Sequence, residues 1–96
     1  MNKDGITRSA TLGSVANAAK VLKSFTPKAR EWGVSDLARR LGIAKSTAHR
    51  LLATLTDEGL LEQDPISGRY RLGLAAFDMA AAAQSMDLHE AVMTPL

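Results

Sequence analysis

The stretch VSDLARRLGIAKSTAHRLLATL, residues 34–55, decides the fold that this sequence predicts. Apolar residues recur at helical spacing on both sides of Gly42, which predicts two helices joined by a tight turn. Glycine adopts the left-handed conformation that ends many helices without a steric penalty. The positions expected to face a shared core are Leu37, Ala38, Leu41, Ile43, Ala48, Leu51, Leu52 and Leu55. Because Ala38 is small enough for close helix crossing and Ile43 can fill the core at the turn, this spacing predicts a helix-turn-helix.

Another helix is expected before this stretch. Ser14 is its expected cap, and Pro27 ends it because the residue before a proline avoids helical geometry. Its apolar residues are Val15, Ala18, Ala19, Leu22 and Phe25. Ser35 is the expected cap of the second helix. The third helix is expected over about 45–58, and Gly59 ends it.

A β-hairpin is expected after the third helix, around the turn-forming sequence DPISG of residues 64–68. The expected strands are residues 60–63 and 69–72, with a very short one over Trp32–Val34. Because side chains alternate along a strand, Tyr70 and Leu72 should face the core. The two arginines beside them, Arg69 and Arg71, should point outward.

The order helix, helix, turn, helix, hairpin predicts a mostly α-helical fold with a small β-hairpin, the winged helix-turn-helix. After Gly73 the helical pattern resumes over Leu74–Met86, with Leu74, Phe77 and Ala81 on one face, and predicts a linker helix. Asp87 is the expected cap of a further helix. The expected organisation is a flexible arm at 1–13, the winged helix-turn-helix at 14–73, the linker helix at 74–86 and the start of another segment at 87–96.

Composition and charge narrow the class of partner. The 96 residues are 46% hydrophobic, which is enough for one small domain. The absence of cysteine excludes disulfides and thiolate metal sites, and it fits a reducing cytosol. No secretory signal or apolar run of membrane-spanning length is visible. Residues 1–73 hold all 12 Lys and Arg and seven of the ten acids, a net charge of +5, whereas residues 74–96 hold three acids and no base, a net charge of −3. A basic front favours a polyanionic partner.

The start of the third helix carries the candidate contacts with duplex DNA. In the docking mode of helix-turn-helix proteins, this part of the second helix of the motif meets base edges in the major groove. Arg50 is the expected reader of a base, because a guanidinium pairs bidentately with guanine. Lys45, Ser46 and Thr47 are expected to hold phosphates at the positive end of the helix, and His49 suits either role.

The hairpin, residues 61–72, is the expected second contact. Arg69 lies near its tip, where it can reach the DNA backbone or the minor groove. Ser35 and Arg71 are candidates for additional backbone contacts. The alternative is that Arg69 and Arg71 contact no DNA and only keep the protein surface soluble.

An enzyme is not expected. Ser46, His49 and Asp57 have the residue types of a hydrolytic triad, but Asp57 lies roughly 12 Å along the helix axis from His49. His89 has no second histidine nearby, so no metal is expected, and the absence of a glycine-rich phosphate loop leaves no cofactor expected. The four aromatic residues, Phe25, Trp32, Tyr70 and Phe77, are better explained as core than as a platform for single strands.

Three stretches together resemble the IclR family of bacterial transcriptional regulators. They are SVANAAKVLKSF at 14–25, VSDLARRLGIAKSTAHRLLATLTDEGLL at 34–61 and DPISGRYRLG at 64–73. The resemblance covers essentially residues 14–96, and the combination of AKSTAHRLLATL with GRYRLG is specific to it.

The resemblance implies sequence-specific binding of a pseudo-palindromic operator by a homodimer, or by a dimer of dimers, in the bacterial cytoplasm at the nucleoid. It places the DNA contacts on Lys45, Ser46, Thr47, His49, Arg50 and Arg69. It also implies a larger C-terminal domain that senses a small molecule such as an organic acid or aromatic metabolite, of which residues 87–96 would be the start. The rest of that domain is missing here, so effector sensing is not expected of this chain. A smaller departure is Ala44, where a capping side chain would add about 1 kcal/mol.

Two alternatives remain. A winged helix can serve as a protein-protein or dimerisation module of a larger enzyme, but that role would favour an apolar or acidic outer face on the third helix. The chain can also be a fragment of an enzyme whose catalytic part was removed, which no residue here supports. Salt dependence separates the first alternative from DNA binding, because phosphate contacts weaken steeply with salt.

Overall fold

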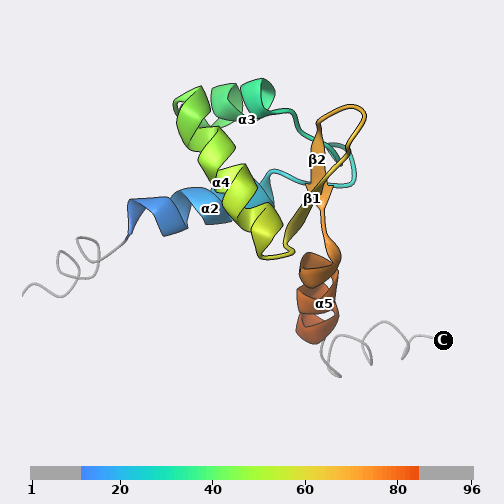
Figure 1. Cartoon of the computed structure of the whole chain (residues 1–96). Coiled ribbons are helices and arrows are strands. Elements are labelled where there is room, and N and C mark those ends of the chain that lie inside the picture. Colours follow the sequence, from blue (N-terminus) through green and yellow to red (C-terminus); the bar gives the residue numbers. More distant parts are fainter. Residues whose placement is uncertain (1–11, 85–96) are drawn as a thin grey trace, which may run out of the picture.

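The computed structural model describes residues 12–84. Figure 1 shows the first helices packed together, a hairpin beside them and a last helix that extends away. The elements are α2 (Gly13–Lys23), α3 (Val34–Leu41), α4 (Lys45–Asp57), β1 (Leu61–Gln63), β2 (Tyr70–Leu72) and α5 (Leu74–Ala83). This is the order predicted for a winged helix-turn-helix followed by a linker helix.

The turn between α3 and α4 has the predicted left-handed glycine. Gly42 has φ 68° and ψ 35°, and its amide donates a hydrogen bond to the carbonyl of Arg39 at 3.3 Å. The amide of Ile43 donates to the carbonyl of Ala38 at 3.1 Å, which closes the helix end. The expectation that the Ile43 side chain fills the core is wrong: it is only half-buried, because the turn lies at the edge of the packed helices.

The core gathers side chains from every described element except α5. Its buried members are Val21, Phe25, Leu37, Leu52, Leu55, Leu61 and Tyr70. The apolar stripe predicted for α3 and α4 is confirmed, whereas that of α2 needs correction. Val21 is fully buried, and Ala19 and Val15 are exposed, Val15 by 60%. The first turn of α2 projects beyond the elements that cover the rest of the helix, so its apolar residues stay outside (Figure 1).

Neither predicted serine cap is used. α2 begins at Gly13 and α3 at Val34, so Ser14 and Ser35 lie inside the first turns, and neither helix has a side-chain cap hydrogen bond. The extended residue that starts α3 is Gly33, with φ −88° and ψ 162°. The backbone enters each helix two residues earlier than the side-chain rule predicts, because cap preference is worth only about 1 kcal/mol and packing overrides it.

The hairpin pairs β1 with β2 in antiparallel register, and each strand begins one residue later than predicted. The predicted short strand near Trp32 is a single bridge, in which Trp32 and Tyr70 exchange backbone hydrogen bonds of 3.0 and 2.8 Å. Tyr70 is buried as predicted. Leu72 is 45% exposed, against expectation, because it lines a hollow that is open at the surface, together with Phe25 and Pro27.

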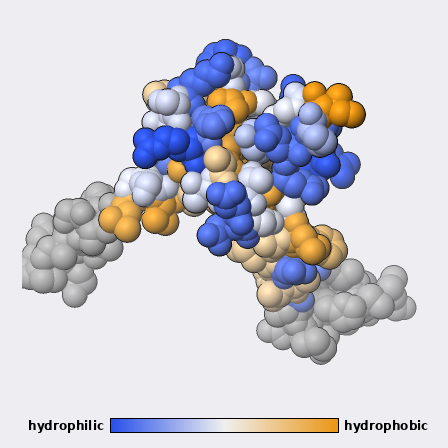
Figure 2. All heavy atoms as spheres, viewed as in Figure 1, coloured by the Kyte–Doolittle hydropathy of each residue, from blue (hydrophilic) through white to orange (hydrophobic). Residues whose placement is uncertain are grey.

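α5 leaves the body at Gly73 and packs mainly against β1. The predicted apolar face is present, but it is exposed: Leu74 by 74% and Phe77 by 71%. In Figure 2 this face forms a hydrophobic area at one end of the molecule. The expected continuation of the helix to Met86 and the expected cap at Asp87 lie outside the described residues. No helix within residues 12–84 is long and apolar enough to cross a membrane.

Candidate nucleic-acid interface

The N-terminal part of α4 presents the predicted contact residues together. Lys45, Ser46, His49 and Arg50 are exposed, and Thr47 is half-buried. On the opposite side of the helix, Ala48 and Leu52 are fully buried in the core, Leu55 nearly so, and they fix the orientation of the exposed side. The structure therefore brings all five predicted residues of this helix to one exposed end.

The backbone at this end of α4 suits an anion. Ala44 is the N-cap residue, with an extended backbone (φ −64°, ψ 147°), and it makes no side-chain cap hydrogen bond. The first amides of a helix have no helical carbonyl to bind, so here they remain available to an outside acceptor. The first turn carries no acid, so nothing opposes the positive end of the helix dipole.

The start of α3 is less suited to phosphate. Ser35 is half-buried, and Asp36 beside it is exposed and pairs with Arg39 one turn later. The acid places negative charge where the helix dipole would otherwise favour an anion. Ser35 therefore has weaker physical support as a contact than the residues on α4.

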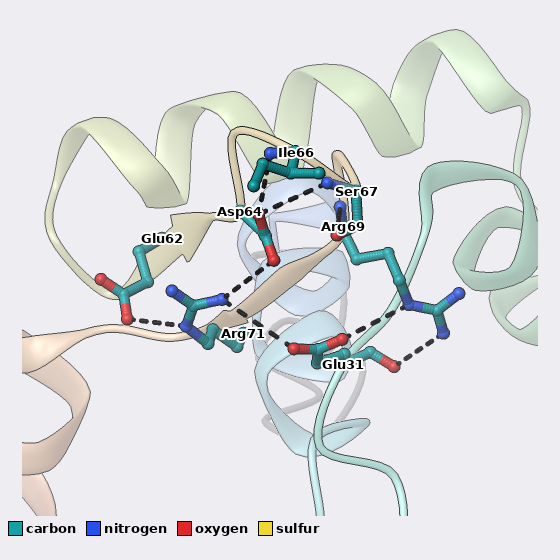
Figure 3. A network of polar contacts seen from close by, with 7 residues as sticks. All are labelled: Glu31, Glu62, Asp64, Ile66, Ser67, Arg69 and Arg71. Carbon is teal, nitrogen blue, oxygen red and sulfur yellow. Dashed lines mark hydrogen bonds and ion pairs between the residues drawn. The ribbon is translucent and has the colours of Figure 1, made fainter.

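Both wing arginines are engaged within the molecule (Figure 3). Arg69 Nε lies 3.6 Å from Glu31 Oε1, and its NH2 donates to the backbone oxygen of Glu31 at 3.5 Å. Arg71 Nε donates to Glu62 Oε2 at 2.9 Å, and its NH1 lies 3.9 Å from both Glu31 Oε2 and Asp64 Oδ2.

The sequence interpretation missed this network. Glu62 lies directly opposite Arg71 in the hairpin register. Aligning the two expected strands across the turn would therefore have predicted the contact between Glu62 and Arg71. Glu31 carries no comparable local signal, because it precedes Arg69 by 38 residues and reaches it only through the Trp32–Tyr70 bridge.

The turn at the wing tip is held by one carboxylate. Asp64 Oδ1 accepts hydrogen bonds from the amides of Ile66 at 2.8 Å and Ser67 at 3.4 Å. These two bonds hold the pKa of the Asp64 carboxyl below its ordinary value of 3.8, with the Ser67 hydroxyl and the Arg71 charge adding to the effect. The turn closes through Gly68, whose φ of 77° favours glycine.

No group of three His, Cys, Asp or Glu among residues 12–84 is arranged to hold a metal ion. His49 lies exposed on α4, and His89 is outside the described residues.

A family model supplies the deciding comparison. The model of the IclR helix-turn-helix domain matches residues 14–65, which is more than half of the chain. The chain belongs to the IclR family. The matched range includes the whole of α4 and its exposed contact candidates, and it ends before Arg69.

Individual IclR-family relatives agree with this assignment. The glycerol operon regulatory proteins of Streptomyces griseus and Streptomyces coelicolor are each 43% identical over 77 residues, covering 80% of this chain and 30% of each relative. The HTH-type transcriptional regulator XynR of Escherichia coli is 41% identical over 61 residues, covering 64% of this chain and 24% of the relative. These relatives are transcriptional regulators and not enzymes.

Solved IclR-family structures share the fold. An IclR-family transcriptional regulator from Brucella abortus superposes with a TM-score of 0.76 at 32% identity, covering 88% of this chain and 32% of that one. An IclR regulator from Alicyclobacillus acidocaldarius gives a TM-score of 0.73 at 39% identity, covering 79% and 31%. The predicted winged helix-turn-helix is thereby confirmed, and this IclR-family chain spans about 30% of the length of the glycerol operon regulatory proteins that it matches.

Proposed function

We propose that this IclR-family chain is the DNA-reading part of a dimeric transcriptional regulator, with α4 in the major groove and the wing, residues 61–72, on the backbone or minor groove. The observation that carries this proposal is the exposed end of α4. It presents two cations, two hydroxyls and an imidazole without an acid, on a helix that the core holds in one orientation. Helix-turn-helix proteins place this part of the second helix of the motif against base edges.

The individual roles follow from chemistry and position. Arg50 is exposed, and its guanidinium suits bidentate pairing with guanine. Lys45, Ser46 and Thr47 lie in the first turn, where side chains and free amides together suit phosphate, and His49 lies one turn further on. In the wing, Arg69 is the candidate for the backbone or minor groove, and Arg71 and Ser35 are additional candidates with less support.

The exposed apolar faces support a symmetric homodimer. Leu74 and Phe77 on α5, and Leu12 and Val15 at the start of α2, are large apolar side chains left in solvent by this chain alone. Figure 2 shows these hydrophobic areas away from the largely hydrophilic end formed by α3. A two-fold dimer would place two copies of α4 on the halves of a pseudo-palindromic operator.

Further properties are proposed from the family alone. A dimer of dimers and a small-molecule effector would depend on the part of an IclR regulator that this chain does not span. One structural neighbour, from Microbacterium hydrocarbonoxydans, is complexed with 4-hydroxybenzoate, which suits an aromatic acid as the class of effector. DNA binding would place the regulator in the cytoplasm, at the nucleoid.

Fluorescence anisotropy with labelled random and genomic duplexes at several salt concentrations tests the proposal. We expect binding that weakens with a log–log salt slope of several units and a subset of fragments bound more tightly. Once a preferred fragment is found, Arg50→Ala should weaken its binding by about 1–3 kcal/mol and that of a scrambled duplex by less.

Lys23→Ala is the matched control, because it removes one exposed positive charge from α2, outside the proposed contacts. Equal weakening of both duplexes by Arg50→Ala would make Arg50 a phosphate contact. A well-formed dimer that ignores duplex DNA even at low salt would overturn DNA binding and favour the protein-contact alternative.

A further inference from the structure

We infer that Glu31 competes with DNA for Arg69 of the wing and restrains this side chain in the free protein. Glu31 holds Arg69 in a weak ion pair that a DNA phosphate displaces. Arg71 keeps its contacts within the protein and remains as the counter-ion of Glu31. This inference rests on the proposed function, and it assigns different roles to two arginines that strand alternation alone points outward together.

Glu31 is fixed next to the wing by the backbone. It lies in the connector between α2 and α3, one residue before Trp32, and the Trp32–Tyr70 bridge ties this connector to β2. Its two carboxylate oxygens face different arginines, with Oε1 at 3.6 Å from Arg69 Nε and Oε2 at 3.9 Å from Arg71 NH1. In Figure 3 the Glu31 side chain lies between the two guanidinium groups.

Arg71 is held by more contacts than Arg69, which makes it the weaker candidate for DNA. Its short hydrogen bond to Glu62, at 2.9 Å, is joined by the longer contacts with Glu31 and Asp64. The five charged residues of this network carry three negative charges and two positive ones. Moving Arg71 onto a phosphate would leave three carboxylates facing the DNA without their shared cation, which like-charge repulsion opposes.

Among residues 12–84, the Arg69 side chain makes polar contacts only with Glu31. Both contacts are long, at 3.6 and 3.5 Å, and both side chains are more than two-fifths exposed. Ion pairs of this kind are worth between nothing and about 1 kcal/mol, so a phosphate can replace the carboxylate at small cost. When Arg69 turns to DNA, Arg71 still lies within ion-pair distance of Glu31, and the carboxylate is not left without a cation.

A double-mutant cycle on DNA binding tests this role. Glu31→Gln, Arg69→Gln and the double variant are titrated against one labelled duplex by anisotropy at fixed low salt, with thermal unfolding as the check on the fold. We expect Glu31→Gln to tighten binding by about two- to fivefold, the strength of an exposed ion pair removed from the free protein. In the Arg69→Gln background the same substitution should change binding by less than half as much.

Glu62→Gln is the matched control, because Glu62 belongs to the same network and, within residues 12–84, its carboxylate pairs with Arg71 and not with Arg69. Its effect on binding should be the same with and without Arg69. If Glu31→Gln tightens binding equally in both backgrounds, the acid acts only by repelling DNA through space and the proposed competition for Arg69 is wrong. If the unmodified chain binds no duplex, the proposed function fails and the inference falls with it, whereas binding without coupling overturns the inference alone.

Discussion

At the scale of single residues, Gly73 shows why one position admits no side chain. A Cβ built there would lie 2.6 Å from the carbonyl oxygen of Gly59 and 3.1 Å from the backbone of Leu61. That backbone has little room to move, because the amide of Gly73 donates to Leu60 O at 2.8 Å and the amide of Ala75 donates to Gly59 O at 3.0 Å. The requirement is for space and not for a left-handed backbone.

We therefore expect Gly73→Ala to lower the free energy of unfolding by about 1–3 kcal/mol, as overpacking against fixed atoms does. Chemical denaturation measures this change. Gly13→Ala is the control, because Gly13 starts α2 with open space around the added methyl group. It should stabilise the fold by up to about 1 kcal/mol. Equal effects of the two substitutions would show that the contact with Gly59 can relax.

The Asp64 carboxylate makes the stability of the wing-tip turn depend on pH. Its pKa is lowered in the folded protein, so its stabilising effect is complete above the ordinary pKa of 3.8 and is lost as the pH falls through the lowered value. NMR titration of the carboxyl group, together with the amide shifts of Ile66 and Ser67, measures this directly. We expect the amides to report the same transition as the carboxyl. A carboxyl pKa at or above 3.8 would contradict the hydrogen-bonded turn.

At the scale of elements, α4 combines a firmly packed side with an uncapped start. The buried residues fix the helix, while Ala44 leaves the first amides without a side-chain acceptor. A helix that used a side chain to satisfy these amides would be more stable but would offer fewer donors to a phosphate. The uncapped start therefore agrees with an anion-binding role.

We expect Ala44→Ser to raise the free energy of unfolding by about 1 kcal/mol, because serine at an N-cap accepts a hydrogen bond from the first turn. Ala53→Ser, in the interior of the same helix, is the control and should be neutral or destabilising. Thermal and urea unfolding of the two variants separate these outcomes. A gain that is the same at both positions would exclude capping as its cause.

At the scale of the whole molecule, two apolar areas lie outside the core. The buried core includes Val21, near the end of α2, and no residue of α5. The start of α2 and most of α5 project from the packed elements into solvent (Figure 1). Single exposed apolar side chains are ordinary, but groups of them on two projecting helices are typical of an interface. They are the surfaces on which the proposed homodimer depends.

The double variant Leu74→Gln with Phe77→Gln tests that surface. We expect its dimer dissociation constant to rise about tenfold or more, since large apolar residues at the centre of an interface can each contribute over 1 kcal/mol. Sedimentation velocity over a range of concentrations measures it. The thermal unfolding of the monomer should change little, because both side chains are exposed. Ile66→Gln, at the wing tip and 95% exposed in the wild-type chain, is the control. If both variants sediment alike, the interface lies elsewhere.

The amino-acid sequence by itself determined the features that depend on near neighbours along the chain. The spacing of Leu37, Ala38 and Gly42 predicted the turn, and the angular positions on the third helix separated its buried side from its exposed end. The DPISG stretch predicted the hairpin. These features follow from helical period and turn geometry, which need only a few consecutive residues, so they can be derived without knowing the fold.

Only the tertiary structure decided how far the core extends and which charges meet. Val21 is buried and Leu72 is exposed because of what other elements cover, and neither helix uses its predicted serine cap because packing outweighs so small a preference. Glu31 meets Arg69 only because the connector bonds to β2, across 38 residues of chain. Contacts between distant segments depend on the arrangement of all elements at once, and no local pattern encodes them.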